Sequence, residues 1–288
     1  MPSPLAALAP SHGYGHDYDL RQSSQAFAGE AGYAGPGKMP RRSKTKQSAE
    51  PARRKVAVFD IDGTIFRSSL LIECVEALIA ARLFPERARA VYAAAHQAWR
   101  DRKGSYEKYI DAVVTAFRRH IVGVAEAEFV QLVRRVMGAH RRHVYRYTRD
   151  LVASLRRRGY FLLAVSHSPK YLVDDFGREL GFDKIYGRVL EVDPSGRFTG
   201  GALHVEVISS KAKVLERAIA KAGLTLAGSV GVGDTEADVG FLHMVEHPIC
   251  FNPNAGLYRV ARRRGWQVVV ERKDVIYEIQ PGQARRVR

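Results

Sequence analysis

The sequence predicts an α/β protein: a Rossmann-like, mostly parallel sheet with helices on both faces and a helical cap inserted into the chain. Two observations support this prediction. Short apolar runs alternate with segments of helical periodicity over the second half of the chain, as in sheets whose parallel strands are joined by helices. A long tract of helical periodicity, residues 68–143, follows the first apolar run directly, so we expect it to form a small helical bundle.

Several segments are expected along the 288 residues. Residues 1–54 are rich in Ala, Gly, Ser and Pro and end in a basic stretch, which is typical of a disordered basic tail. The α/β core is predicted over 55–66 and 146–280, the cap over 67–145, and a basic C-terminal tail over 281–288. The first residues lack a charged segment followed by a long apolar core, so no signal peptide is expected.

Composition narrows the class of protein. Apolar residues make up 46% of the chain, which is ordinary for a soluble globular protein. The chain has two cysteines, Cys74 and Cys250, so we expect no disulfide framework and a cytoplasmic location, where thiols stay reduced. A membrane span is not expected, because no apolar run reaches the roughly 18 residues that one needs.

The formal net charge of +16 leaves three interpretations open. It is compatible with a nucleic-acid partner, with an anionic membrane, or with a field that attracts a small anionic substrate. Much of the excess is spread along predicted helices as arginine pairs, such as Arg118-Arg119 and Arg134-Arg135, and forms no single block. The sequence gives no indication of the oligomeric state.

The first predicted strand, Val56–Phe59, leads into two carboxylates, Asp60 and Asp62. Its apolar run is typical of a strand buried on both faces, and Gly63 favours a turn after it. Asp60 then falls at the carboxyl edge of the sheet, where open α/β sheets bind their ligands. Buried acids are costly unless a cation or a reaction uses them, so we expect a magnesium-dependent phosphoryl-transfer site.

The cap is predicted to contain about four helices, because apolar residues recur at helical spacing within it and glycines interrupt the pattern near 104 and 123. Ser105 is placed to cap the third of these helices. The rest of the core is expected to alternate strands, at 161–165, 184–192, 197–203, 229–232, 248–251 and 267–270, with helices at 151–157, 170–180 and 210–222, a short helix after 233 and an Arg-rich helix before 267.

Three later stretches carry further polar candidates. Ser166 follows the second buried strand, where a hydroxyl and free backbone N–H groups make either an anion site or simply a helix cap. Lys211 begins a predicted helix, with Lys213 as a nearby alternative. Asp234 and Asp238 follow an apolar strand four residues apart, which fits either a shared site or an acidic helix start stabilised by the helix dipole.

Four sites along the chain resemble, in the order in which they occur, the four motifs of the haloacid-dehalogenase superfamily of phosphohydrolases. They are the pentapeptide Asp60–Thr64, Ser166, Lys211 and the stretch Gly233–Asp238. A helical cap between the first and second motifs resembles subfamily IB, the phosphoserine-phosphatase-like branch. The resemblance covers about residues 55–270. It implies a Rossmann-like core whose cap closes over the substrate.

The resemblance also implies a role for each matched residue. Asp60 is expected to attack phosphorus and form an aspartyl-phosphate, and Asp62 to act as general acid and base. Ser166 and Lys211 are expected to hold the phosphoryl oxygens. Mg²⁺ is expected on Asp60, Asp234 and the backbone carbonyl of Asp62, because hard oxygen ligands suit it. Asp238 is expected to orient Lys211 or a water on the metal.

Three positions depart from the phosphoserine-reading members of this branch. Ser69 stands where those members place an acid, Asp111 falls near the place of a cap arginine, and His167-Ser168 replaces a pair of glycines. A zwitterionic amino acid would lack its expected partners, so phosphoserine is expected to be a poor substrate. Another small organic phosphate, or a phospholipid-type monoester, fits better.

The sequence therefore predicts a Mg²⁺-dependent phosphomonoesterase. Two alternatives stay open: a phosphotransferase of the same fold, and a basic protein that uses the fold to bind RNA or anionic membrane without turnover. His167 is expected either to contact substrate or to pack on a neighbour. Cap residues Arg67, Glu73 and Tyr106 are expected on helix surfaces rather than in the site.

Overall fold

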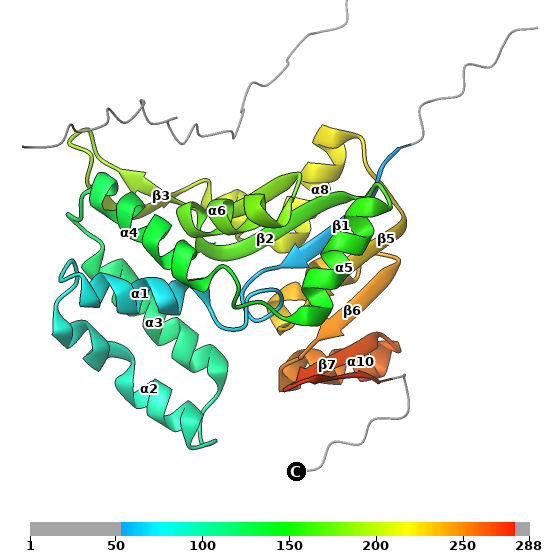
Figure 1. Ribbon diagram of the computed structural model, residues 1–288, viewed down its shortest axis with the longest axis horizontal. Helices are drawn as coiled ribbons and strands as arrows, with labels where there is room; N and C mark the ends of the chain where they lie inside the picture. The colour runs from blue at the N-terminus through cyan, green and yellow to red at the C-terminus, as the bar shows by residue number, and fades with distance from the viewer. Residues whose placement is uncertain (1–52, 280–288) are drawn as a thin grey trace, which may run out of the picture. The chain divides into compact units, whose positions relative to one another are not determined.

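The computed structural model describes residues 53–279 of the chain (Figure 1). The predictions for residues 1–52 and for the C-terminal tail, 281–288, lie outside these described residues. Arg54 already belongs to the folded part, because its guanidinium donates a hydrogen bond of 2.8 Å to the backbone carbonyl of Tyr160. The first strand begins at Lys55, one residue before its predicted start at Val56.

The described residues contain one eight-stranded sheet, with strand order β4-β3-β2-β1-β5-β6-β7-β8. Its inner strands are parallel, and antiparallel pairing occurs only at the two edges, between β3 and β4 and between β7 and β8. The predicted mostly parallel sheet is confirmed. The strands are β1 Lys55–Asp60, β2 Phe161–Pro169, β3 Lys184–Val192, β4 Phe198–Leu203, β5 Thr225–Gly233, β6 His247–Phe251, β7 Gln267–Arg272 and β8 Val275–Ile279.

Helices pack on both faces of this sheet. In Figure 1, α5 (Arg146–Arg157) and α6 (Lys170–Leu180) lie in front of the sheet and α8 (Lys211–Ala222) lies behind it. This follows from right-handed crossovers, because the chain adds strands in one direction from β1 to β3 and in the other from β5 to β7. The remaining helices of the core are α7 Val205–Ile208, η2 Glu236–Asp238, α9 Val239–Leu242 and α10 Ala255–Arg264.

The inserted cap consists of four α-helices, as predicted, together with one short 3₁₀ turn. Ser105 caps the third helix by accepting a hydrogen bond from the Lys108 backbone N–H. Ring contacts join the cap to the core: Phe129 lies 5.1 Å from Phe198 and 5.6 Å from Tyr171, measured between ring centroids. The elements are α1 Leu70–Ala80, η1 Glu86–Arg89, α2 Ala90–Arg100, α3 Tyr106–His120 and α4 Glu126–His140.

Some element boundaries differ from the sequence-based expectation. Helix α5 begins at Arg146 instead of 151, and β5 begins at Thr225 instead of 229. Strand β8 and the four-residue helix α7 were not expected. The division into core and cap at residues 67 and 145 remains a prediction, because the described residues, 53–279, all fall within one compact unit.

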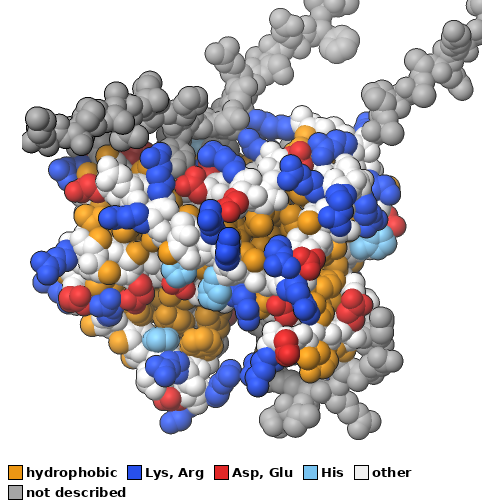
Figure 2. Space-filling model, in the orientation of Figure 1, with side chains coloured by type: hydrophobic (Ala, Val, Ile, Leu, Met, Phe, Trp, Pro, Cys, Tyr) orange, Lys and Arg blue, Asp and Glu red, His pale blue; other side chains and the backbone are white. Residues whose placement is uncertain are grey.

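Surface and composition show three further features. Figure 2 shows Lys and Arg side chains over both the cap and the core on the face in view, with acidic side chains among them. Cys74 and Cys250 are both free and buried. Among the helices of residues 53–279, none has the length and apolar character that a membrane crossing requires.

Candidate active site

The candidate site lies at the carboxyl ends of β1 and β5. These strands are neighbours, and Phe59 of β1 pairs with Val232 of β5. The strand order reverses its direction between them, and such a switch point opens a crevice at the strand ends. Asp60 is the last residue of β1, and Asp234 directly follows β5. The sheet therefore brings together two acids that are 174 positions apart in the printed sequence.

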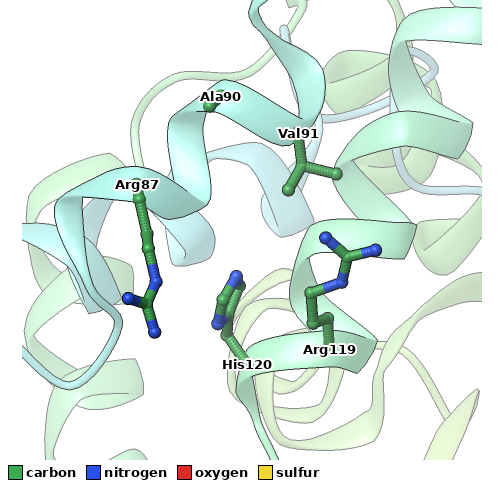
Figure 3. A pocket seen from close by; sticks show the side chains of 5 residues that line it. All are labelled: Arg87, Ala90, Val91, Arg119 and His120. Carbon is green, nitrogen blue, oxygen red and sulfur yellow. The ribbon is translucent and has the colours of Figure 1, made fainter.

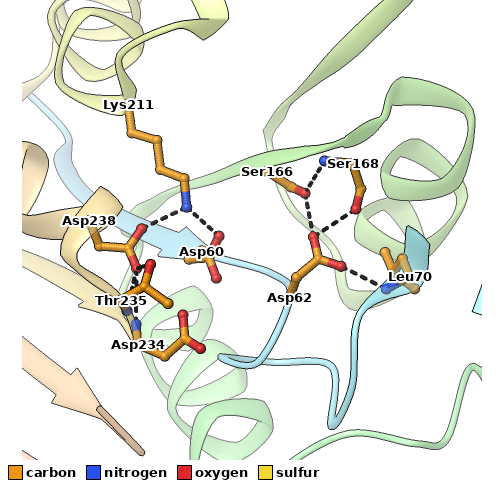
Figure 4. Close-up of polar contacts among 9 residues, drawn as sticks. All are labelled: Asp60, Asp62, Leu70, Ser166, Ser168, Lys211, Asp234, Thr235 and Asp238. Atoms are coloured by element: carbon orange, nitrogen blue, oxygen red, sulfur yellow. Dashed lines mark hydrogen bonds and ion pairs between the residues drawn. The ribbon is translucent and has the colours of Figure 1, made fainter. Parts of the chain in front are cut away.

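Lys211 reaches this pair of strands from the start of α8. Its side chain is buried, and its Nζ lies 2.5 Å from Oδ1 of Asp60 and 2.6 Å from Oδ1 of Asp238 (Figure 4). Burial alone would lower the pKa of Lys211, but the carboxylates of Asp238 and Asp60 outweigh it and raise that pKa above its usual range. The lysine is thus held as a cation between two acids.

Asp238 anchors this arrangement with both of its carboxylate oxygens. Oδ1 accepts from Lys211, whereas Oδ2 accepts from the backbone N–H groups of Asp234 and Thr235, each at 3.0 Å. The Thr235 hydroxyl also donates to Oδ2, at 3.3 Å. Because donors already occupy both oxygens, Asp238 supports the lysine and the Asp234 turn and has little capacity left for a further ligand.

The cluster carries more negative charge than the described residues neutralise. One carboxylate oxygen each from Asp60, Asp234 and Asp238 lies within 4.8 Å of the other two, and all three residues are buried. Lys211 is the partner in each ion pair that this cluster forms within residues 53–279. Three carboxylates against one ammonium leave two negative charges, which suits a divalent cation.

Burial also perturbs the titration of these acids. Desolvation, opposed by Lys211, raises the pKa of Asp60 from 3.8 to about 7. Desolvation and the neighbouring charge of Asp60 raise the pKa of Asp234 well above its usual range. Because burial makes the ionised form of these two carboxyl groups costly, a bound cation would strongly stabilise that form. The residues present therefore fit Mg²⁺, with Asp60 and Asp234 as the side chains that have room for it.

Gly63 allows Asp234 to approach the turn after β1. The residue has a φ of +80°, which already favours glycine. A Cβ atom at this position would come within 2.2 Å of a carboxylate oxygen of Asp234 and 3.1 Å of its Cγ. A side chain at position 63 would therefore displace the acid that completes the site. Two separate constraints therefore favour glycine at position 63: the positive φ of the backbone and the close approach of Asp234.

Asp62 lies across from the acid cluster and points to other partners. Its Oδ2 accepts from the hydroxyls of Ser166, at 2.6 Å, and Ser168, at 2.9 Å, and its Oδ1 accepts from the backbone N–H of Leu70, at 2.7 Å (Figure 4). Ser166 was expected to hold phosphoryl oxygens; in this structure its hydroxyl donates to Asp62 instead. The contact with Leu70 ties this carboxylate to the first turn of the first cap helix.

Ser168 is a polar group of the site that the sequence analysis did not assign. Strand β2 continues to Pro169, beyond the predicted end at 165. Side chains two apart on a strand share a face, so Ser166 and Ser168 both meet Asp62. His167 falls on the other face, where its ring hydrogen-bonds the backbone of Ile208. The alternation Ser-His-Ser was the signal available in the sequence.

Known proteins resemble this chain over the segment that forms the site. Residues 57–243, well over half of the chain, match the haloacid dehalogenase-like hydrolase family. The chain belongs to this family. The match spans Asp60, Asp62, Ser166, Lys211 and Asp234, so the family membership expected from four short motifs is confirmed.

Individual relatives of this hydrolase are distant. The "Inhibition of morphological differentiation protein" of Streptomyces azureus is 26% identical over 223 residues, which cover 75% of this chain and 78% of that protein. A "probable phosphatase" of Mycobacterium tuberculosis is 25% identical over 238 residues, which cover 78% of each chain. A solved structure titled "Phospho-Aspartyl Intermediate Analogue of Phosphoserine phosphatase" matches at a TM-score of 0.52 and 18% identity, covering 77% of this chain and 96% of that one, and this likeness shows the fold.

Two of the positions that were expected to depart from the phosphoserine-reading members lie in the cap. Ser69 is buried, and its hydroxyl caps α1 by accepting from the Leu71 backbone N–H at 3.3 Å. Asp111 lies exposed on α3.

Tyr106 of this hydrolase begins α3, and its side chain is partly buried. It was expected on the surface of a cap helix. Burial, together with the negative charges of Asp62 and Asp234, raises its pKa above the usual range. Of the other two cap residues, Arg67 has its guanidinium 5.3 Å above the Tyr145 ring, and a carboxylate oxygen of Glu73 lies 3.7 Å from Nε2 of His140.

Proposed function

We propose that this hydrolase is a Mg²⁺-dependent phosphomonoesterase that works through an aspartyl-phosphate on Asp60. One observation carries the proposal: a buried lysine and three buried carboxylates converge at the end of β1, with net negative charge left for a divalent cation. The family membership and a relative named as a probable phosphatase support the same reaction class. The substrate is a small organic phosphate ester.

Asp60, Asp234 and the backbone carbonyl of Asp62 would hold the metal. Bound there, Mg²⁺ supplies positive charge that keeps the carboxylates ionised and offsets the negative charge of the phosphoryl group. Lys211 adds a fixed cation next to Asp60, because Asp238 and α8 hold its Nζ in place. This arrangement lets an anionic nucleophile approach an anionic ester.

Asp60 then attacks phosphorus with the carboxylate oxygen that Lys211 does not hold. A bond forms between this oxygen and phosphorus, and the bond between phosphorus and the ester oxygen breaks. Asp62 donates its proton to the departing ester oxygen, which leaves as an alcohol. In the second half, Asp62 takes a proton from a water whose oxygen attacks phosphorus, and Asp60 departs as a carboxylate with release of inorganic phosphate.

The contacts of Asp62 place its carboxylate next to the hydroxyl that is proposed to bind phosphate. Ser166, Ser168 and the Leu70 N–H all donate to this carboxylate. An arriving phosphoryl group competes with Asp62 for the Ser166 hydroxyl, so substrate binding rearranges the hydrogen bonds around the residue that exchanges the proton.

The groups that the protein offers around the site do not suit phosphoserine as a substrate. Ser69 is occupied as a helix cap, Asp111 would repel a carboxylate, and Ser168 replaces a glycine beside the phosphate-binding strand. A monoester without an amino acid moiety avoids these conflicts. We expect kcat/KM for phosphoserine to fall below that for neutral-alcohol monoesters.

A panel of phosphate monoesters tests the function. Purified wild-type protein with Mg²⁺ should release inorganic phosphate from at least one ester, and Asp60→Asn should lower kcat by at least about 10³-fold because the attacking carboxylate is lost. Excess chelator should have a similar effect. Unchanged turnover in Asp60→Asn would reject the nucleophile, and unchanged turnover in chelator would reject the metal.

A further inference from the structure

A cavity lies within the cap, and none of the catalytic acids lines it. It has a volume of about 490 Å³ and is lined by Arg87 of η1, Ala90 and Val91 of α2, and Arg119 and His120 at the end of α3 (Figure 3). Ligand pockets in proteins commonly hold 300–1,000 Å³, so about 490 Å³ suffices for a small organic molecule. Two of its five lining side chains are arginines, a third is the imidazole of His120, and none is acidic.

The two arginines of this cavity have no counter-charge among the described residues. Neither Arg87 nor Arg119 forms an ion pair or a side-chain hydrogen bond within residues 53–279. The neighbouring acids Glu76 and Glu86 both pair with Arg89 instead. Two guanidinium groups are thus left facing one cavity with their donors available, and guanidinium forks match the oxygens of a phosphate.

The end of α3 does not by itself explain this cluster. A helix C-terminus favours cations, which accounts for Arg119 and His120 in the last turn. Arg87 comes from a different segment, so the helix dipole gives no reason for it to face the same space. Burial, with Arg119 and Arg87 nearby, lowers the pKa of His120. The local field is therefore positive and lacks an anion.

We propose that this cap cavity binds the phosphate group of a small organic phosphate, with Arg87 and Arg119 as the ligands of the phosphate and Val91 and Ala90 as the floor under the organic part. His120 lies between the two arginines and donates a further hydrogen bond. Phe84 packs on the His120 ring at 5.8 Å between centroids, which fixes the imidazole in the cavity wall. The site is independent of the proposed reaction.

The cavity is distant from the catalytic acids along one helix. Asp62 and Asp234 are among the charges that act on Tyr106, which begins α3, whereas the charges that act on His120, which ends it, are those of Arg119 and Arg87. A helix of 15 residues spans about 20 Å, so a bound phosphate here does not touch the catalytic acids. Occupancy of the two sites is separately measurable.

The test follows the His120 ring by NMR in the full-length protein. Its Cε1–H resonance is assigned by its absence in His120→Gln, and phenylphosphonate, a stable analogue of an organic phosphate, is titrated in. Wild-type protein should show a saturable shift, and Arg87→Gln/Arg119→Gln should weaken the apparent affinity at least tenfold, because each lost guanidinium contact to a phosphate is charge-assisted. Both arginines are exposed, so the fold should persist, and Arg87→Gln alone serves if the double variant unfolds.

Arg134→Gln/Arg135→Gln is the matched control, because it removes the same charge from exposed positions on α4 that do not line the cavity. This control should bind within about twofold of wild type. An equal loss of affinity in the control would show that net charge alone causes the effect, and this would overturn the proposed site. A titration without saturation would also overturn it. Acetate binding as tightly as phenylphosphonate would reject a phosphate ligand, and inorganic phosphate binding as tightly would reject the organic part.

Discussion

Gly63 shows how one missing side chain sets the position of a catalytic acid. Its positive φ and the close approach of Asp234 both exclude a Cβ atom, and the second constraint bears on the metal. Gly123 has the same φ of +80°, but a Cβ atom there would meet nothing within 4 Å. The two glycines therefore separate backbone strain from crowding of the site.

Gly63→Ala should destabilise the fold and weaken the metal site together. Backbone strain alone costs about 1 kcal/mol, which Gly123→Ala should reproduce without changing the Mg²⁺ dependence of activity. Gly63→Ala should lose more stability than that and need at least tenfold more Mg²⁺ for half-maximal activity. Urea unfolding and Mg²⁺ titration of turnover measure the two effects. Equal behaviour of the two variants would show that Asp234 tolerates a side chain at 63.

Individual site residues differed in how visible they were in the sequence. Asp60 follows a buried strand, so its position at the carboxyl edge of the sheet was predicted from the residues themselves, whereas the roles of Asp62 and Asp234 were predicted from the resemblance to the family's motifs. Ser168 was missed because it lies beyond the predicted end of its strand.

Among the elements, α5 begins earlier in the chain than the sequence predicted, and its hydrogen bonds show why. Its first backbone N–H groups, those of Arg146 and Tyr147, donate to the carboxylate of Glu271 at 3.1 and 2.9 Å. This acid lies on β7, so the cap of the helix comes from a residue about 125 positions away. Propensity within the helix pointed to 151, whereas a partner distant in sequence extends the helix to Arg146.

Glu271→Ala should loosen the first turn of α5. Losing a carboxylate that accepts from two helix-start N–H groups should cost about 1 kcal/mol of unfolding free energy, measured in urea. Glu216→Ala is the control, because that acid is exposed in the middle of α8 and caps nothing. Its unfolding free energy should stay within about 0.5 kcal/mol of wild type. A Glu271→Ala protein as stable as this control would mean that the helix start does not depend on the acid.

At the scale of the whole molecule, the acid cluster links stability to pH. The folded state holds Asp60 with a pKa of about 7, above its usual 3.8, and raises the pKa of Asp234 in the same direction. A raised acid pKa means that the folded protein binds the proton more tightly than the unfolded chain does. This contribution to stability is complete below about pH 4 and is lost as the pH rises to about 7.

The chelated protein should therefore lose unfolding free energy between pH 4 and pH 7. Each raised acid adds up to about 1.4 kcal/mol per pH unit to the slope. Asp60→Asn should flatten the decline, and Mg²⁺ should restore stability most strongly near pH 7, where the cation replaces the proton. Denaturant midpoints at several pH values measure this. A slope that Asp60→Asn leaves unchanged would assign the pH dependence to other groups.

The overall architecture was the most predictable level. Alternating strands and helices gave the parallel sheet and the inserted cap, and both are observed. The edges were less predictable. Strand β8 pairs only with β7, and β5 begins early through an irregular register that passes Gly228, whose φ is +70°. The strand was expected to begin at 229, directly after this glycine.

The central position of β1 has a consequence for synthesis of the protein on the ribosome. Asp60 emerges early, but its neighbour β5 and the lysine of α8 come more than 150 residues later. A nascent chain, or a fragment that ends before residue 238, carries the nucleophile and no complete set of acids to bind the cation. Enzymatic competence should therefore arise only once nearly the whole described chain has left the exit tunnel.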